Sequence, residues 1–206
     1  LDIIEICDAL HLEQIIFVGH SVSSTIGWIV ADQRPELFSQ LVMICPSPCF
    51  LNLGQEYQGG FERQDLENLI QLMDKDYIGW GNYLAPIVMG TDLPADCTHN
   101  NESDKLVYEL LSSFCSTDVT YSKPFAKATF FSDYRFLLPK ISHPCLILQS
   151  SNDTLAATTI GQYIKDKLQN ARLEIVEANG HCLHMTHPMH VLNHMKTFIH
   201  KNIITV

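Results

Sequence analysis

Short apolar runs alternate with longer segments of helical periodicity along the 206 residues of this chain. Each run is bounded by turn-forming residues, which is typical of a strand buried on both faces. Such strands are predicted at 15–18, 41–45, 144–149 and 173–177. Apolar residues three or four positions apart predict helices at 2–10, 22–33, 158–168 and 191–200. Strands that alternate with helices are typical of a parallel sheet covered on both faces, so the predicted fold class is α/β.

Residues 50 to about 131 interrupt this alternation, because helical segments follow one another there with no strand between them. They are predicted at 62–73, 77–88, 102–114 and 119–131. We interpret them as a four-helix cap inserted into the core, which divides the chain into 1–49 (core), 50–131 (cap) and 132–206 (core). Four aromatic residues of the cap are predicted to line a substrate pocket, although each is equally suited to hold the cap helices together: Phe61, Trp80, Tyr83 and Phe130.

Charge and the length of the apolar runs exclude two classes of partner. The net charge is −10 with only 13 lysines and arginines, so the chain has little with which to neutralise nucleic-acid phosphates. Its longest apolar runs fall far short of the roughly 20 residues that span a bilayer. We therefore predict no nucleic-acid partner and no membrane partner.

The chain has seven cysteines, an odd number, and no C-x-x-C pair that would indicate a zinc or redox site. Several lie inside predicted strands, where free thiols pack as small apolar groups. We therefore predict no metal, no cofactor and a cytoplasmic location. Residues 1–6 lack the basic start and apolar stretch of a signal peptide, and they read as an internal start of a longer protein.

The most informative motif follows the first predicted strand, where Gly19 and Ser23 flank Ser21 two positions away on either side. Small residues at these positions allow the sharp strand-to-helix turn of a nucleophile elbow, which holds the serine in a strained conformation with its hydroxyl above the sheet. Ser23 stands where glycine is commoner, so the motif alone leaves a plain strand-to-helix turn as an equal alternative. The amide of Val22, at the start of the next helix, is the predicted oxyanion donor.

A serine nucleophile needs a base and an acid that orients the base, and both are expected at the carboxyl ends of parallel strands. Asp153 follows the predicted strand at 144–149, and His181 follows the one at 173–177. The chain order Ser21, Asp153, His181 is that of α/β-hydrolases. The alternative for Asp153 is a carboxylate that caps a turn or helix.

Other histidines lie close to these residues in the sequence. His181, His184 and His187 could in principle present metal ligands, but their spacing matches no standard zinc pattern. His20 precedes the serine and must point away from it across the turn, so it is predicted to be a pocket-wall or core residue. Cys182 is predicted to be a packing residue.

Six short motifs are distributed over nearly the whole chain: Gly19-His20-Ser21-Val22, Arg34-Pro35-Glu36-Leu37-Phe38, Pro46-Ser47-Pro48-Cys49-Phe50-Leu51-Asn52, Tyr57-x-Gly59-Gly60-Phe61-Glu62, Phe114-Cys115-Ser116-Thr117-Asp118 and Gly180-His181-Cys182-x-His184-Met185. Together they closely resemble the RsbQ family of bacterial sigma-B stress-regulator hydrolases. That family is itself similar to the strigolactone and karrikin receptor hydrolases of plants.

The resemblance implies an α/β-hydrolase with a helical cap over an apolar pocket, and it places the triad at Ser21, Asp153 and His181. It also implies a small hydrophobic substrate or signal and a PAS-domain PP2C phosphatase partner of the RsbP type in stress signalling. Ala157 stands where the family usually has proline. The family's first strands and its His-Gly oxyanion loop should precede Leu1, so residues 1–206 alone are expected to be neither well folded nor fully active.

Three functions therefore compete. The first is a serine hydrolase of small hydrophobic esters or lactones that acts in signalling. The second is a non-catalytic module that senses a ligand, and the third is an ordinary metabolic carboxylesterase or carbon–carbon bond hydrolase. The sequence favours hydrolysis, because a module without catalysis has no need for all three residue types at strand ends.

Overall fold

The computed structural model describes residues 2–91 and 102–203, and its core is a parallel sheet with the strand order β1-β2-β3-β4. The strands are β1 (Ile15–His20), β2 (Phe38–Ile44), β3 (Cys145–Asn152) and β4 (Ala171–Asn179). Their register places Val18 beside Val42, and Val42 beside Leu146. The prediction of an α/β fold with a parallel sheet is confirmed.

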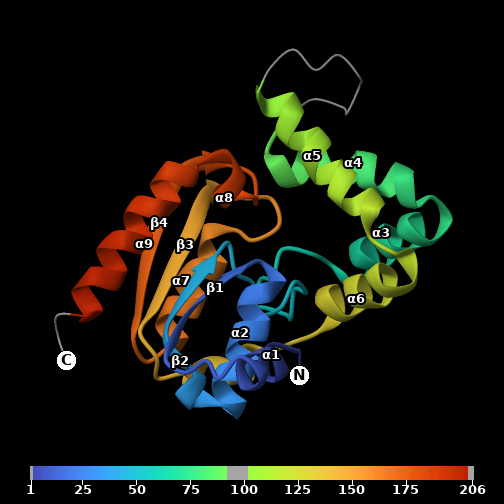
Figure 1. The fold of residues 1–206 in the computed structure, drawn as a ribbon. Coiled ribbons are helices and arrows are strands. Elements are labelled where there is room, and N and C mark those ends of the chain that lie inside the picture. The colour runs from blue at the N-terminus through green and yellow to red at the C-terminus, as the bar shows by residue number, and fades with distance from the viewer. Residues whose placement is uncertain (1, 92–101, 204–206) are drawn as a thin grey trace.

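The two faces of the sheet pack against different helices, because successive side chains of a strand point to opposite sides. Leu41 and Met43 of β2 point toward α2 (Val22–Gln33) and α7 (Thr158–Lys167). Val42 and Ile44 point the other way, toward α9 (Pro188–Ile203). Helices therefore cover both faces, with α1 (Asp2–Ala9) beside α2 in the same layer (Figure 1).

Strand β1 is covered unevenly. Phe17 packs into the cluster beneath α2, whereas Ile16 and Val18 on the opposite face are 37% and 45% exposed. Helix α9 packs over β2 and β3 on this face, whereas Ile16 and Val18 of β1 remain partly exposed. Among the described residues, β2 is the one strand that pairs with β1.

The four predicted cap helices are present as α3 (Arg63–Lys75), α4 (Tyr77–Met89), α5 (Glu102–Ser116) and α6 (Val119–Phe131). They lie together to one side of the sheet (Figure 1). Their own apolar cluster, which includes Leu66, Met73 and Trp80, holds them together. Asp76 and Asp118 begin α4 and α6 by accepting hydrogen bonds from backbone amides two or three residues later. The division at residues 49/50 and 131/132 stays a prediction.

Three short elements were not predicted: the 3-10 helices η1 (Pro35–Leu37) and η2 (Arg135–Lys140), and the single-turn helix α8 (Leu183–Thr186). Each is too short to show an apolar period. The six cysteines that the structure describes are all free thiols, and Cys97 lies outside the described residues. None of the described helices is both long and apolar enough to cross a bilayer.

Candidate active site

Ser21 sits in the sharp turn between β1 and α2 and has the backbone angles φ 54° and ψ −123°. A residue with a side chain rarely adopts this conformation, which costs on the order of 1–3 kcal/mol and is found at functional sites. Gly19 makes the turn possible, because a Cβ at this position would lie 2.8 Å from backbone atoms of Ser23 and Ser24. The amide of Ser21 donates to the carbonyl of Ile44 at 2.9 Å and ties the turn to β2.

Asp153 lies in the loop that follows β3, and its carboxylate is buried. The amides of Leu155 and Ala156 donate to its Oδ1 at 2.9 and 3.0 Å, and the side-chain amide of Gln149 donates to Oδ2 at 3.2 Å. Asp153 therefore does cap the turn after β3, which is the alternative role considered for this residue from the sequence. Its second oxygen remains available for a further donor.

That donor is His181, which follows β4 and is 2% exposed. Its Nδ1 lies 2.8 Å from Asp153 Oδ2, and its Nε2 lies 2.7 Å from Ser21 Oγ. Because a carboxylate only accepts, Nδ1 carries the proton and Nε2 is left to accept the serine hydroxyl. The structure thus joins the three predicted residues in one hydrogen-bonded chain. The neighbouring Ser24 is fully buried, and its hydroxyl donates to the carbonyl of Gly19 instead.

A cap helix holds the histidine loop in place. The amide of His181 donates to the carbonyl of Val88, near the end of α4, at 2.6 Å. The backbones of Gly90 and Gly180 meet at the same point, and both residues have positive φ, 72° and 83°. A Cβ on either glycine would lie within 2.6 Å of backbone atoms of the other segment, so only glycine allows this approach.

Two further histidines surround the base. His20 Nε2 donates to the carbonyl of His181 at 2.9 Å, and the His20 ring lies 4.9 Å from that of His181 and 4.4 Å from that of His184. Burial, together with these two neighbours, lowers the pKa of His20 to about 3, and burial also lowers the pKa of His184. His20 lines the cavity above Ser21, as predicted for a pocket-wall residue. It is therefore neutral at neutral pH and adds no positive charge beside His181.

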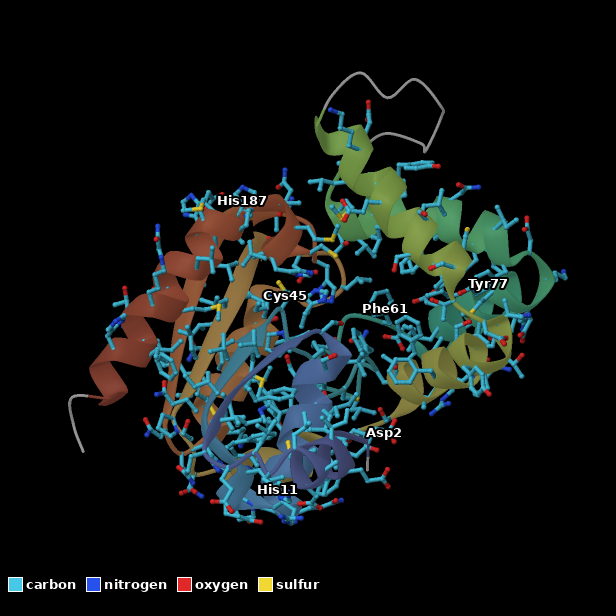
Figure 2. The ribbon with its side chains drawn as sticks, in the orientation of Figure 1. Asp2, His11, Cys45, Phe61, Tyr77 and His187 are labelled. Carbon is cyan, nitrogen blue, oxygen red and sulfur yellow. The ribbon has the colours of Figure 1, made fainter. Side chains whose placement is uncertain are left out.

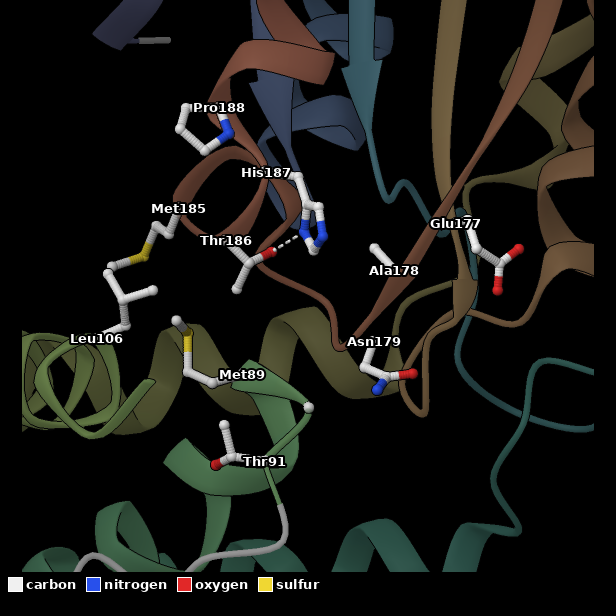
Figure 3. Close-up of a pocket in the computed structure, with 11 residues that line it drawn as sticks. Met89, Thr91, Leu106, Glu177, Ala178, Asn179, Met185, Thr186, His187 and Pro188 are labelled. Atoms are coloured by element: carbon white, nitrogen blue, oxygen red, sulfur yellow. Dashed lines mark hydrogen bonds between the residues drawn. The ribbon is translucent and has the colours of Figure 1, made fainter. Parts of the chain in front are cut away.

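The three-histidine metal site that was considered from the sequence does not form. His187 lies in a different pocket, where its Nδ1 is 2.9 Å from Thr186 Oγ1 (Figure 3). Within the described part of the chain, the group of three possible ligands consists of Cys45, Asp153 and His181. Two of these already bind each other, and burial raises the pKa of the Cys45 thiol, which disfavours the thiolate that a metal requires.

A cavity of about 610 Å³ lies between the serine and the cap. Ser21, Val22 and His181 line it on the core side, while Trp80 and Phe130 line it from the cap as predicted. Val22 is the first residue of α2, so its amide belongs to the helix N–H groups that have no intrahelical acceptor and point toward this cavity end of the helix. The remaining aromatic side chains of the lining are Phe114 and Phe125.

The predictions for Phe61 and Tyr83 need correction, because these residues line a neighbouring cavity between α3 and α4 instead. Trp80, Leu84 and Val88 form one row of side chains along α4 at i, i+4 spacing, and Tyr83 and Ile87 form the neighbouring row, so the two rows reach different cavities. Figure 2 shows Phe61 between the sheet and the cap helices.

Several residues were not predicted from the sequence to line this cavity. Glu109 and Ser113 of α5 are four positions apart, as are Leu110 and Phe114, and all four line the cavity. This i, i+4 spacing is the signal for a shared helix face. It does not reveal what the face contacts.

Comparisons with known proteins agree with this geometry. The family model described as alpha/beta hydrolase fold matches residues 1–188. The chain is 31% identical over 199 residues to "Strigolactone esterase RMS3" of Pisum sativum, which covers 95% of this chain and 70% of that protein. It is 33% identical over 203 residues to "Karrikin insensitive 2 receptor CA" of Petunia hybrida, covering 98% of this chain and 72% of the other.

Among solved structures, a hydrolase from Oleispira antarctica, olei00960, has 51% sequence identity and a TM-score of 0.85. The match covers 94% of this chain and 69% of that one. The serine, the acid and the base follow strands β1, β3 and β4 of the parallel sheet, and the relatives are named esterases and hydrolases. The chain belongs to the α/β-hydrolase fold family and is an enzyme of the esterase type.

Proposed function

We propose that the protein is a serine hydrolase of small hydrophobic esters or lactone-like molecules, with Ser21 as nucleophile, His181 as base and Asp153 as the group that orients the base. The observation that carries the proposal is the hydrogen-bonded chain from Ser21 through His181 to the buried Asp153, at one end of an apolar cavity. Strain at Ser21 and the bond of its amide to β2 fix the position of the hydroxyl.

The chemistry follows from this arrangement. Ser21 Oγ attacks the acyl carbon while its proton passes to His181 Nε2, and Asp153 stabilises the imidazolium that forms. The amide of Val22 donates to the oxyanion. His181 then returns the proton to the leaving alkoxide, and a water molecule releases the acyl group by the reverse sequence. For a lactone, the leaving alkoxide stays attached, and the product is a hydroxy acid.

The cavity lining supports the substrate class. Trp80, Phe114, Phe125 and Phe130 give it aromatic walls, and His20 is neutral because its pKa is low. An uncharged apolar molecule binds such walls by burying its surface, whereas a carboxylate would lose its hydration without gaining a cationic partner. Short acyl chains are expected, because aromatic side chains of the cap line the cavity opposite Ser21 and limit how far an acyl chain can extend from the serine.

The test is hydrolysis of p-nitrophenyl acetate by Ser21→Ala and His181→Ala. Each should reduce turnover by on the order of a million-fold, as is typical when a triad serine or histidine is removed. Ser24→Ala is the matched control for Ser21→Ala, and His187→Ala is the control for His181→Ala. Both controls should stay within about tenfold of the wild type. Undiminished hydrolysis by Ser21→Ala would overturn the assignment.

We further propose a signalling role like that of sigma-B regulators, with a PP2C-type phosphatase as partner and a cytoplasmic location. The resemblance of the sequence motifs supports the role, and the six free thiols in the described residues support a reducing compartment. The test is copurification with a PAS-domain phosphatase from the source cell, followed by an assay of phosphatase activity with and without this protein. A phosphatase that neither binds nor responds would refute the role.

A second candidate, a receptor that retains its ligand, is favoured by one observation: relatives at 32–33% identity are named karrikin insensitive 2 receptors. A receptor of this kind holds its ligand and need not hydrolyse it. Pre-steady-state kinetics with p-nitrophenyl acetate separates the two, because a receptor gives at most one stoichiometric burst, followed by very slow turnover or none. Sustained turnover favours the esterase.

A further inference from the structure

Two cavities lie on either side of one turn of helix α4. The first is the cavity at Ser21, and the second, here called the α3–α4 cavity, lies between α3, α4 and the loop after Asp153. Each has a volume of about 610 Å³. Leu84 and Leu155 line both cavities, so these two side chains form the partition between them.

The two halves of the partition differ in how firmly they are held. The amide of Leu155 donates to Asp153 Oδ1 at 2.9 Å, so movement of this residue would disturb the acid that orients His181. Leu84 projects from the middle of α4, and its side chain is 6% exposed. Truncation of Leu84 therefore opens the partition without disturbing the hydrogen bonds of Asp153 and His181.

The α3–α4 cavity is suited to an uncharged apolar chain. Most of its lining is apolar and comes from the loop before α3 and from the facing sides of α3 and α4. Asp65 lies in the same lining, and its Oδ2 accepts from the amide of Glu62. This carboxylate disfavours an anionic group. The apolar residues that line only this cavity are Phe61, Leu69, Leu72 and Ile87, with Tyr83 at its side.

We propose that Leu84 determines the length of the acyl chain that the enzyme accepts, and that the α3–α4 cavity takes the apolar tail of longer esters when Leu84 is shortened. This inference rests on the proposed esterase function. In the structure as it stands, the partition confines substrates to the Ser21 cavity. Without the Leu84 side chain, one continuous space runs past Leu155 from the serine to the region between α3 and α4.

Helix α4 supplies its own matched controls. Val88→Ala enlarges the Ser21 cavity alone, and Ile87→Ala enlarges the α3–α4 cavity alone, because each residue lines one cavity only. Both remove apolar side-chain atoms from the same helix as Leu84→Ala does. A double variant, Leu84→Ala with Leu72→Trp, opens the partition but refills the α3–α4 cavity from α3.

The experiment compares kcat/KM for p-nitrophenyl decanoate with kcat/KM for p-nitrophenyl acetate in the full chain. Leu84→Ala should raise this ratio by at least about tenfold, since the apolar contacts of even one methylene are worth that much in a pocket. Ile87→Ala and the double variant should stay within about threefold of the wild type. An equal ratio in Leu84→Ala and Ile87→Ala would overturn the proposal, as would a gain that persists in the double variant. Leu84→Val replaces Leu84→Ala where the latter unfolds at the assay temperature.

A binding measurement separates failure of this inference from failure of the proposed function. Trp80 lines the Ser21 cavity, so its fluorescence reports occupancy by a ligand that cannot be hydrolysed, such as 1-decanol. Leu84→Ala should bind 1-decanol about tenfold more tightly than Ile87→Ala does. If Ser21→Ala proves fully active while this difference holds, the partition stands and the catalytic assignment falls. Equal affinities would refute the partition even in an active esterase.

Discussion

The close contact between the end of α4 and the histidine loop leads us to predict that Gly180→Ala displaces His181. A Cβ on Gly180 would lie 2.5 Å from the carbonyl carbon of Met89 and 2.6 Å from the amide nitrogen of Gly90. Ordinary contact begins at 3.4 Å, so Gly180→Ala requires a movement of roughly 1 Å between two backbone segments. The residue that moves with the loop is His181.

Two costs add up in Gly180→Ala, and they are separable. The left-handed backbone, with φ of 83°, costs roughly 1–2 kcal/mol for any residue that has a Cβ. Gly54 has φ of 63° with nothing within 4 Å of the added Cβ, so Gly54→Ala carries the first cost without the overlap. Displacement of His181 by about 1 Å from Ser21 is expected to lower kcat by about 100-fold.

The assay measures kcat/KM for p-nitrophenyl acetate and the free energy of unfolding in urea for both variants. Gly54→Ala should lose about 1 kcal/mol of stability and keep its activity. Gly180→Ala should lose more stability and about 100-fold in kcat/KM while still folded. If folded Gly180→Ala is as active as Gly54→Ala, the docking of α4 does not position His181, and the reasoning is wrong.

Three further predictions concern the charge of the site. Because the pKa of His20 is about 3 in the folded protein and 6.5 in an exposed histidine, only the unfolded chain binds a proton there between these values. The free energy of unfolding should therefore fall as the pH drops below about 6.5, and His20 should account for a loss of about 2 kcal/mol at pH 5. Urea unfolding at a series of pH values should show that the free energy of unfolding of His20→Gln depends less steeply on pH than that of the wild type. An equally steep pH dependence in His20→Gln would refute the contribution of His20. Asp153→Asn should fold and lose about 10⁴-fold in kcat, since an amide no longer fixes the imidazole tautomer, and retention of wild-type kcat would contradict that role. Dialysis against EDTA should leave hydrolysis unchanged, and its loss would revive a metal at Cys45, Asp153 and His181.

The sequence was sufficient to predict the main elements and the members of the hydrogen-bonded chain. Strands with both faces buried give continuous apolar runs, and residues at their carboxyl ends must meet at one edge of the sheet. Ser21, Asp153 and His181 therefore followed from the elbow motif, from the ends of the predicted strands and from their order in the chain. The role of Gly19 could also be predicted, because the sharp turn at Ser21 requires small residues two positions away on either side.

Contacts between distant segments were not predictable in the same way. An amphipathic pattern tells which residues share a helix face but not what that face meets, so Tyr83 was assigned to the wrong cavity and Leu84 was overlooked. The bond between His181 and Val88 depends on where the cap docks. The low pKa of His20 likewise depends on burial that arises only in the folded chain.

The central claim, that Ser21 is the nucleophile, is tested most directly by mass spectrometry after reaction with a fluorophosphonate. The account predicts one covalent adduct per chain, mapped by peptide sequencing to Ser21, and lost in Ser21→Ala and in His181→Ala. An adduct on Ser24, or a folded wild-type protein that forms no adduct while still hydrolysing p-nitrophenyl acetate, would contradict it.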